Sequence, residues 1–441
     1  MLDQQKAYSA LQKKREMFYA YLENHQQQRK VQQEQIDAFL QIGYHQLLAL
    51  LARGEAKWPG AIPTAEFDQA QGLSMQFAPC QRIVQSNGHA RGSEPWVNHQ
   101  DAREWALEVL MNRPVIAVDG SQISPNLDLA TPVGAVQIGW FVNQHSQEGT
   151  YVKDLDFEVF LPQDLLNNEP NASQELDYAN RRINQERFER ECSKLCDLMA
   201  SYGNRPDDEK PLCFFDGSFI ISFAGQLRPE LGAPYLGSIR KLLDTSQKNR
   251  VPLVGFVDNP HSRDVAKLIE FTLSQRVLVQ GIPNQSASNP AEGRLSDDVL
   301  AHDAELLGTK LLAQNWGARS PLFICARDDA LSREDVRTGD GRASFYRTVC
   351  FTYLRLTQDR LPARIELPKW LVDEGRADEI LDLVRAECII GLGYPYAIET
   401  ADALAVISHR DRERFYGMIQ QSFPEINLTQ SRKVASKQTR R

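Results

Sequence analysis

Two short apolar segments of this chain run directly into the same tripeptide, Asp-Gly-Ser. Residues 115–118 (Val-Ile-Ala-Val) precede Asp119, and residues 212–215 (Leu-Cys-Phe-Phe) precede Asp216. Each segment has the length and composition of a buried strand, and the Asp-Gly pair that follows predicts a sharp turn. Asp-Gly is also a common turn dipeptide, so a purely structural role remains an alternative. Two copies after two buried strands favour a functional site that uses both aspartates.

The segments between and after these two complete an alternating pattern. Strands are expected at residues 133–142, 151–161 and 251–257, a long helix ends near Tyr202, and another helix covers residues 236–247. The order is therefore three strands, helix, strand, helix, strand. The first three strands are close enough for an antiparallel meander, whereas the later ones need crossover connections. This order predicts an α/β fold with a ribonuclease H-like mixed sheet flanked by helices.

The C-terminal half adds further elements to this pattern. Strands are expected at residues 322–325, 347–356 and 364–367, and helices at about 373–388 and 397–407. The two helices have apolar faces of the kind that cover a sheet.

Three regions follow from the same pattern. Residues 1–110 are expected to form a helical and irregular N-terminal extension, and residues 111–426 the ribonuclease H-like domain, with a polar insertion near 284–297. The basic tail 427–441 is expected to be disordered. The first 52 residues are expected to be helical. They would either pack on the core as a hairpin or offer a surface to a partner, and the two roles are compatible.

The composition limits how the chain can meet its partners and where it works. The net charge of −8 means that any contact with nucleic acid must use local basic patches, bound metal or a partner protein. The seven cysteines are scattered without zinc-binding spacing, as in proteins that keep reduced thiols. The first residues do not resemble a signal peptide, and no apolar run reaches the roughly 18 residues of a membrane helix. We therefore expect a cytoplasmic protein without a membrane partner.

The two aspartates suggest a metal site. Ligands of open α/β sheets bind beyond the strand ends, where Asp119 and Asp216 are expected to lie on neighbouring strands. Paired carboxylates need a positive counter-charge, and hard oxygen donors suit Mg²⁺ or Mn²⁺.

A third carboxylate is expected from the long helix before Tyr202. This helix carries three glutamates beside an apolar stripe that consists of Phe188, Cys192, Leu195 and Met199. Glu186 falls nearly opposite the stripe, whereas Glu189 and Glu191 both flank it. The pattern favours either of the latter two, and a solvated helix edge is the alternative for each.

Asp402 is a fourth acidic residue of interest. It lies near the start of the expected helix at 397–407, after the segment Gly393-Tyr394-Pro395-Tyr396. Negative charge is favourable there because of the helix dipole, so spacing alone does not select Asp402 as a ligand.

Together these motifs resemble the NurA nuclease family. The resemblance rests on residues 116–121, on residues 214–218, and on residues 393–396 leading into the helix of Asp402, and it spans about residues 110–410. It implies a ribonuclease H-like core, dependence on Mn²⁺, 5′ to 3′ resection of DNA ends and endonuclease activity on single strands. It also implies a homodimer that works with a HerA-type hexameric DNA-translocating ATPase in double-strand break repair.

The resemblance also implies a set of site residues. Asp119, Asp216 and Glu191 match the family's metal-binding carboxylates, and Asp402 takes a position that is often histidine in the family. These four would hold Mn²⁺ or Mg²⁺ and hydrolyse a DNA phosphodiester, with Glu189 as the alternative to Glu191. Two other functions are alternatives: a non-catalytic DNA-end adaptor for a DNA-translocating ATPase, and a phosphatase or related hydrolase.

Overall fold

The computed structural model describes most of the chain, namely residues 3–53, 59–78, 98–125, 131–165, 175–280, 302–312, 315–327, 335–338 and 341–424. The polar insertion expected near 284–297 and the basic tail 427–441 lie outside these residues. The chain forms two compact units. Unit 1 comprises Met1–Gln76, Asn259–Asp328 and Phe351–Ala363, and unit 2 comprises Phe77–Asp258, Asp329–Cys350 and Arg364–Arg441. This division differs from the contiguous one expected from the sequence, because the chain passes between the units several times.

The main sheet of unit 2 is mixed, and its strand order is β11-β6-β5-β2-β3-β4. The strands are β2 (Val115–Ile123), β3 (Gly134–Asn143), β4 (Tyr151–Phe160), β5 (Leu212–Asp216), β6 (Leu253–Val257) and β11 (Ala363–Pro368). β2, β3 and β4 form an antiparallel meander, and β5 runs parallel to both β2 and β6. β11 is antiparallel to β6. The predicted ribonuclease H-like sheet is therefore confirmed.

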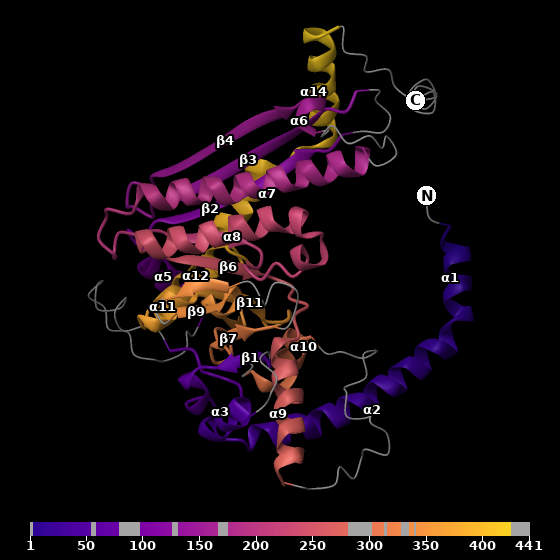
Figure 1. Ribbon diagram of the computed structural model, residues 1–441, viewed down its shortest axis with the longest axis vertical. Helices are drawn as coiled ribbons and strands as arrows, with labels where there is room; N and C mark the ends of the chain where they lie inside the picture. The colour runs from indigo at the N-terminus through magenta and orange to yellow at the C-terminus, as the bar shows by residue number, and fades with distance from the viewer. Residues whose placement is uncertain are drawn as a thin grey trace. The chain divides into compact units, whose positions relative to one another are not determined.

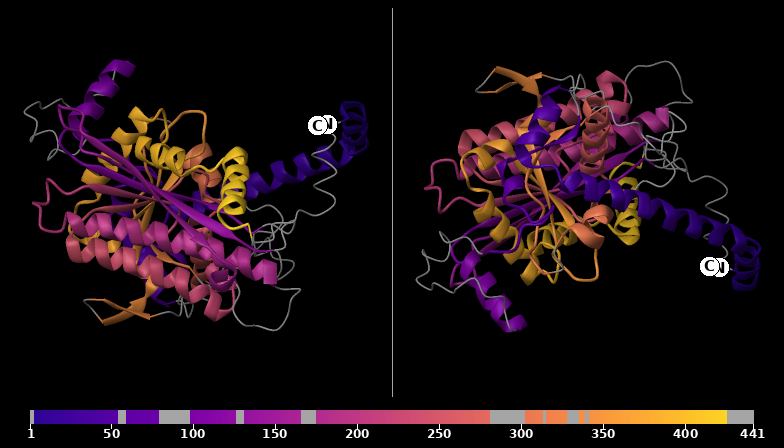
Figure 2. Two further views of the ribbon diagram at one scale, coloured as in Figure 1. Left: turned by 90° about the horizontal axis from the view of Figure 1, so that it is seen from above. Right: turned by 90° about the horizontal axis from the view of Figure 1, so that it is seen from below.

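Helices cover both faces of this sheet. α7 (Glu175–Ser201) and α8 (Pro229–Asn249) lie side by side on one face (Figure 1). On the other face, α13 (Tyr396–Ala405) packs on β2 and β3, and α12 (Ala377–Ile390) packs on α13 and on α5 (His99–Leu110). The left view of Figure 2 shows α7 and α8 on one side of the sheet and the yellow C-terminal helices on the other. This cover explains why the central strands are apolar on both faces.

One element departs from its predicted boundaries in a way that affects the site. β2 was expected to end at Val118, before a turn at Asp119-Gly120-Ser121. It continues instead to Ile123, because β3 pairs with it along its whole length, up to Ile123 opposite Ala135. The predicted turn at Asp119 is therefore wrong. The second motif does end its strand, since β5 stops at Asp216 and Gly217 has a φ of 136°.

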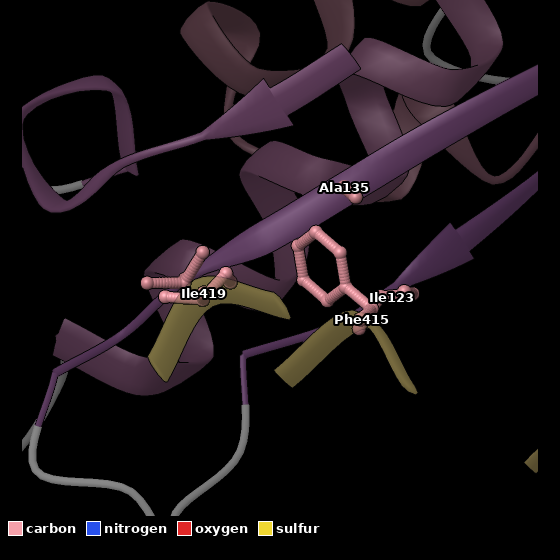
Figure 3. Close-up of a cluster of buried hydrophobic side chains, with 5 residues drawn as sticks. Ile123, Ala135, Phe415 and Ile419 are labelled. Atoms are coloured by element: carbon pink, nitrogen blue, oxygen red, sulfur yellow. The ribbon is translucent and has the colours of Figure 1, made fainter. Parts of the chain in front are cut away.

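The helix α14 (His409–Ser422) follows α13 and was not predicted from the sequence. It begins with a capping box in which Ser408 and Asp411 exchange hydrogen bonds. Its Phe415 and Ile419 pack on Ile123, Val133 and Ala135, at the far ends of β2 and β3 (Figure 3). α14 thus anchors the extended part of β2 that the sequence pattern did not reveal.

Unit 1 contains the N-terminal helices that the sequence predicts. These are α1 (Gln4–Lys13), α2 (Arg15–Leu40) and α3 (Tyr44–Arg53), and α9 (Asp264–Gln280) packs on α2, α3 and β1. β1 (Gly60–Pro63) pairs antiparallel with β7 (Phe323–Ala326), which neighbours β10 (Val349–Leu354). The buried Asp303 accepts the backbone N–H groups of Val265 and Ala266 and so caps the start of α9.

The remaining elements are short. They are η1 (Ala65–Asp68), α6 (Pro162–Leu165), η2 (Ala224–Gln226), α10 (Asp303–Leu306), η3 (Leu307–Leu311), β8 (Asp335–Thr338), β9 (Gly341–Ser344), η5 (Phe345–Thr348) and α11 (Lys369–Asp373). None of the helices in the described ranges is both long and apolar enough to cross a membrane.

Candidate active site

Asp119 and Asp216 lie side by side on neighbouring parallel strands. The register pairs Val118 of β2 with Phe215 of β5, so the two aspartates occupy the next matched positions. Adjacent strands are about 4.8 Å apart, which brings both carboxylates to one edge of the site. Both belong to unit 2 and line the same cavity of about 650 Å³. The structure therefore brings together the two aspartates on which the sequence interpretation depends.

Asp402 approaches Asp119 from the face of the sheet that α13 covers. Gly139, the β3 partner of Asp119, allows this approach, because a Cβ at Gly139 would stand 2.9 Å from the Cβ of Leu404. The Asp402 carboxyl lies close enough to contribute to the raised pKa of Asp119. The structure thus places Asp402 beside Asp119, although spacing along the sequence did not select it.

Glu191 approaches from the opposite face, on α7. A Cβ added at Gly120 would lie only 2.5 Å from Glu191 Oε1. The glycine of the first motif therefore leaves the space that the Glu191 carboxylate occupies. Glu191 forms an ion pair with Arg187, and its side chain is only 11% exposed. Arg187 also donates from Nη1 to the backbone oxygen of Gly120, at 3.3 Å.

The other two glutamates of α7 face elsewhere. Glu189 accepts a hydrogen bond from Gln185 at 2.6 Å and does not line the cavity. Glu186 is paired with Arg182 and Arg190 along the helix. Of the two candidates left open by the sequence, the structure therefore places Glu191 beside the aspartates.

Burial, and to a smaller extent the neighbouring carboxylates, raise the pKa values of Asp119, Glu191 and Asp216. Burial, followed by the charges of Asp216 and Asp402, raises the pKa of Asp119 to about 6, although the Gly120 N–H opposes this. Burial raises the pKa of Glu191 to about 8, with Arg187 opposing and Asp119 adding to the rise. Burial, with the charges of Asp402 and Asp258, also raises the pKa of Asp216. The site therefore holds more negative charge than the surrounding protein compensates.

The sequence interpretation missed two residues that contact these carboxylates. The Tyr394 hydroxyl donates to Asp216 Oδ1 at 3.2 Å, and its ring packs edge-on against Phe256. The other residue is Arg187. Tyr394 belongs to the Gly-Tyr-Pro-Tyr segment that pointed to the family, so a signal for it was present. Nothing in the local pattern distinguished Arg187 from the other arginines of α7.

A buried charge cluster holds the turn that carries Asp216. Glu366 is fully buried on β11 and accepts hydrogen bonds from Ser218 Oγ at 2.9 and 3.0 Å and from the Phe219 N–H at 2.7 Å. The equally buried Arg364 donates to Glu366 from Nε at 2.7 Å. The serine of the second motif thus fixes the strand end, which keeps the Asp216 carboxylate in place.

The donor set fits a hard divalent cation. As the side chains are placed, however, no group of three His, Cys, Asp or Glu side chains among the described residues could hold a metal ion. The negative charge of Glu191 is balanced instead by its ion pair with Arg187. Carboxylate oxygens are the preferred ligands of Mg²⁺ and Mn²⁺. A cation at this place would stabilise the ionised carboxylates, whose pKa values are raised first by burial and then by one another's charges.

Comparison with known proteins gives one family match. The NurA domain matches residues 113–407. A structure of NurA with manganese is 9% identical, covers 70% of this chain and 89% of its own, and has a TM-score of 0.35. The catalytic domain of human Endonuclease V is 14% identical, with coverages of 77% and 94% and a TM-score of 0.29. The C-terminal lobe of a budding yeast Argonaute is 11% identical, with coverages of 74% and 54% and a TM-score of 0.27. No curated protein matches the chain.

Proposed function

Because this chain belongs to the NurA family, we propose that it is a metal-dependent nuclease that hydrolyses DNA phosphodiesters. One observation carries the proposal: carboxylates from β2, β5, α7 and α13 converge at one place beside a cavity. Asp119, Asp216, Glu191 and Asp402 would hold Mn²⁺ or Mg²⁺ there. A bound cation of this kind would supply the positive charge that stabilises the pentacoordinate phosphate of the transition state.

The protein's own groups would position the carboxylates and the phosphate. Asp119 and Asp216 are held by paired strands, and the Tyr394 hydroxyl orients Asp216 through its hydrogen bond to Oδ1. Arg187 keeps a second contact with the Gly120 oxygen. If the Glu191 side chain rotates toward a bound metal ion, its ion pair with Arg187 is broken. Arg187 is still held at the site by the Gly120 oxygen, and its guanidinium can then pair with a DNA phosphate.

The finer activity follows the family resemblance. We propose 5′ to 3′ resection of DNA ends and endonuclease activity on single strands in double-strand break repair, with Mn²⁺ as the preferred metal. We also propose a homodimer that works with a HerA-type ATPase. Apolar side chains on the N-terminal helices support an assembly surface, since Tyr8, Met17 and Phe18 are each more than half exposed.

The full-length protein should degrade linear duplex DNA from its 5′ ends in the presence of Mn²⁺. A 5′ label should be released early as short products, whereas a 3′ label should stay on gradually shortened strands. Circular single-stranded DNA should be opened, and EDTA should stop every reaction. Gel analysis of both labels checks this. A folded protein that binds DNA but cuts none of these substrates in Mn²⁺ or Mg²⁺ would support the adaptor function, and hydrolysis of only a small phosphomonoester would support the phosphatase.

The same preparation tests the assembly. Light scattering should give about twice the chain mass of 50.0 kDa. Addition of a HerA-type ATPase with ATP should increase the rate of end resection. A monomer, or an ATPase without effect on the rate, would argue against the proposed partners and leave the nuclease proposal intact.

Gly120→Ala should impair the site while the sheet still forms. Gly120 has no positive φ, so alanine fits the backbone, but the new methyl group would stand 2.5 Å from Glu191 Oε1 and 2.9 Å from Ile138 Cδ1. Glu191 must then move away, and we expect kcat to fall roughly 10- to 100-fold. Overpacking should cost about 1–3 kcal/mol of unfolding free energy. Steady-state kinetics and denaturant unfolding measure the two effects.

The matched control is Gly237→Ala, because a Cβ there meets nothing within 4 Å. This helical variant should keep full activity. In the Gly120→Ala background, Glu191→Gln should add little further loss, since both changes act on the same carboxylate. Fully additive losses would show that Gly120 acts on something other than Glu191.

A further inference from the structure

The cavity beside the carboxylates has two chemically different walls. One wall comes from α7 and presents Arg181, Asn184, Gln185 and Arg187. The second group of lining residues comes from the segment between β5 and α8 and from α8 itself, and it presents Ile220, Ile221, Phe223, Leu227 and Tyr235. Asp119, Glu191 and Asp216 line the same cavity. A ligand that reaches the carboxylates from this side therefore meets an aromatic surface and a polar, basic surface at once.

The aromatic wall is a built platform. Phe223 and Tyr235 meet edge to face with centroids 5.2 Å apart, and Phe188 supports Tyr235 at 5.0 Å. Gly232 brings α8 close to this segment, since a Cβ there would lie 2.4 Å from the oxygen of Ala224. The Phe223 side chain is nevertheless 48% exposed. The segment is thus held against α8 while one aromatic ring remains open to the cavity.

Among the described residues, one cation of the basic wall has no ion-pair partner. Arg182, Arg187 and Arg190 of α7 are each paired with glutamates. Arg181 is exposed and forms no ion pair with any residue that the structure describes. Its charge is therefore available to an anion at the cavity, and Asn184 beside it is held by a hydrogen bond from Gln122.

We propose that this cavity holds one unstacked nucleobase of a single DNA strand, with the base against Phe223 and Tyr235 and a neighbouring phosphate at Arg181. The proposal rests on the proposed nuclease function and names the form of its substrate. A volume of about 650 Å³ accommodates a nucleotide. Stacking on aromatic rings suits any base and contributes about 1–3 kcal/mol per base.

The net charge of the chain and the structure of duplex DNA both favour binding of a single strand at this cavity. A chain with a net charge of −8 gains little from unspecific attraction to DNA, so stacking and a few local cations must supply the affinity. In an intact duplex each base is already stacked and paired, and its removal costs a few kcal/mol. The cavity therefore selects single strands and frayed ends over duplex interiors.

The first test measures binding without metal, so that no cleavage occurs. Fluorescence anisotropy compares the wild type with Phe223→Ala on short single-stranded oligonucleotides that carry one abasic site at successive positions. For the wild type, an abasic site at one defined position should weaken binding roughly tenfold or more. Phe223→Ala should weaken binding to intact DNA by a similar factor and lose the response to that position. The exposed Phe423, replaced by alanine, is the matched control and should behave like the wild type.

The second test adds Mn²⁺ and follows cleavage. Phe223→Ala should lose activity on intact single-stranded DNA, whereas the wild type and the variant should cut the oligonucleotide that is abasic at the defined position at the same low rate, because that substrate has no base to stack on Phe223. If Phe223→Ala binds and cuts DNA like the wild type, with the same abasic pattern, the base site is refuted and the nuclease stands. If the wild type shows the abasic pattern in binding but cuts neither substrate, the base site stands and the proposed nuclease function fails.

Discussion

Asp119→Asn should abolish DNA cleavage and make the metal-free protein more stable at neutral pH. Asp119 interacts with each of the other three carboxylates, Asp216, Asp402 and Glu191. An amide in its place binds a divalent cation poorly and removes one negative charge. Loss of several kcal/mol of transition-state stabilisation corresponds to a roughly 10³-fold lower kcat. Quantitative cleavage assays with Mn²⁺ measure this effect.

The gain in stability follows from the raised pKa of Asp119. Its pKa in the folded protein is about 6, above the ordinary value of 3.8. A raised pKa contributes stability that is fully present below the ordinary value and is lost as the pH rises through about 6. At pH 8 the folded wild type therefore carries an unfavourable charge that asparagine removes. We expect a higher melting temperature for Asp119→Asn at pH 8 and a much smaller difference at pH 4.

The exposed Asp208, replaced by asparagine, is the control and should change neither quantity. Circular dichroism melting curves at both pH values give the comparison. A folded Asp119→Asn protein with wild-type cleavage would remove Asp119 from the active site. A variant that is less stable at pH 8 would show instead that the aspartate is a structural group.

Addition of Mn²⁺ should raise the melting temperature of the wild type by about 5 °C at saturating metal and pH 8. Without metal, the carboxylates repel one another, and stability should fall as the pH rises from about 4 to about 8, because burial raises the pKa of Asp119 to about 6 and that of Glu191 to about 8. A cation binds the ionised carboxylates and offsets their repulsion. The metal-bound protein should therefore lose this pH dependence, and metal affinity should rise with pH over the same range.

The control is the Asp119→Asn, Asp216→Asn double variant, which should lose the metal-induced stabilisation and show a smaller fall in stability with pH, because only the buried Glu191 still has a strongly raised pKa. Calorimetric melting with and without Mn²⁺, Mg²⁺ and EDTA distinguishes the two metals and gives their affinities. An unchanged melting temperature at millimolar Mn²⁺ and Mg²⁺ would mean that the four carboxylates do not form a metal site, and the nuclease proposal would lose its chemical basis.

Local patterns were sufficient for the strands and for the pair of aspartates. Short apolar runs identify buried strands because side chains alternate between two covered faces, and most of the predicted strands fall within a few residues of the observed ones. The same reasoning failed at residues 119–121, where β2 continues. Its continuation depends on pairing with β3 and on the packing of α14, and both are contacts between segments distant in sequence.

The amino-acid sequence by itself therefore determined the order of strands and helices, the ribonuclease H-like sheet and the motifs that match the family. The tertiary structure decided which carboxylates meet. The packing of α7 on β2 turns Glu191 rather than Glu189 toward the aspartates, and Gly120 leaves the space that the Glu191 carboxylate occupies. The approach of α13 over Gly139 brings in Asp402. The periodicity of the sequence shows which face of a helix is apolar. Which of the polar residues beside that face reaches the site depends on how closely the helix and the strand pack.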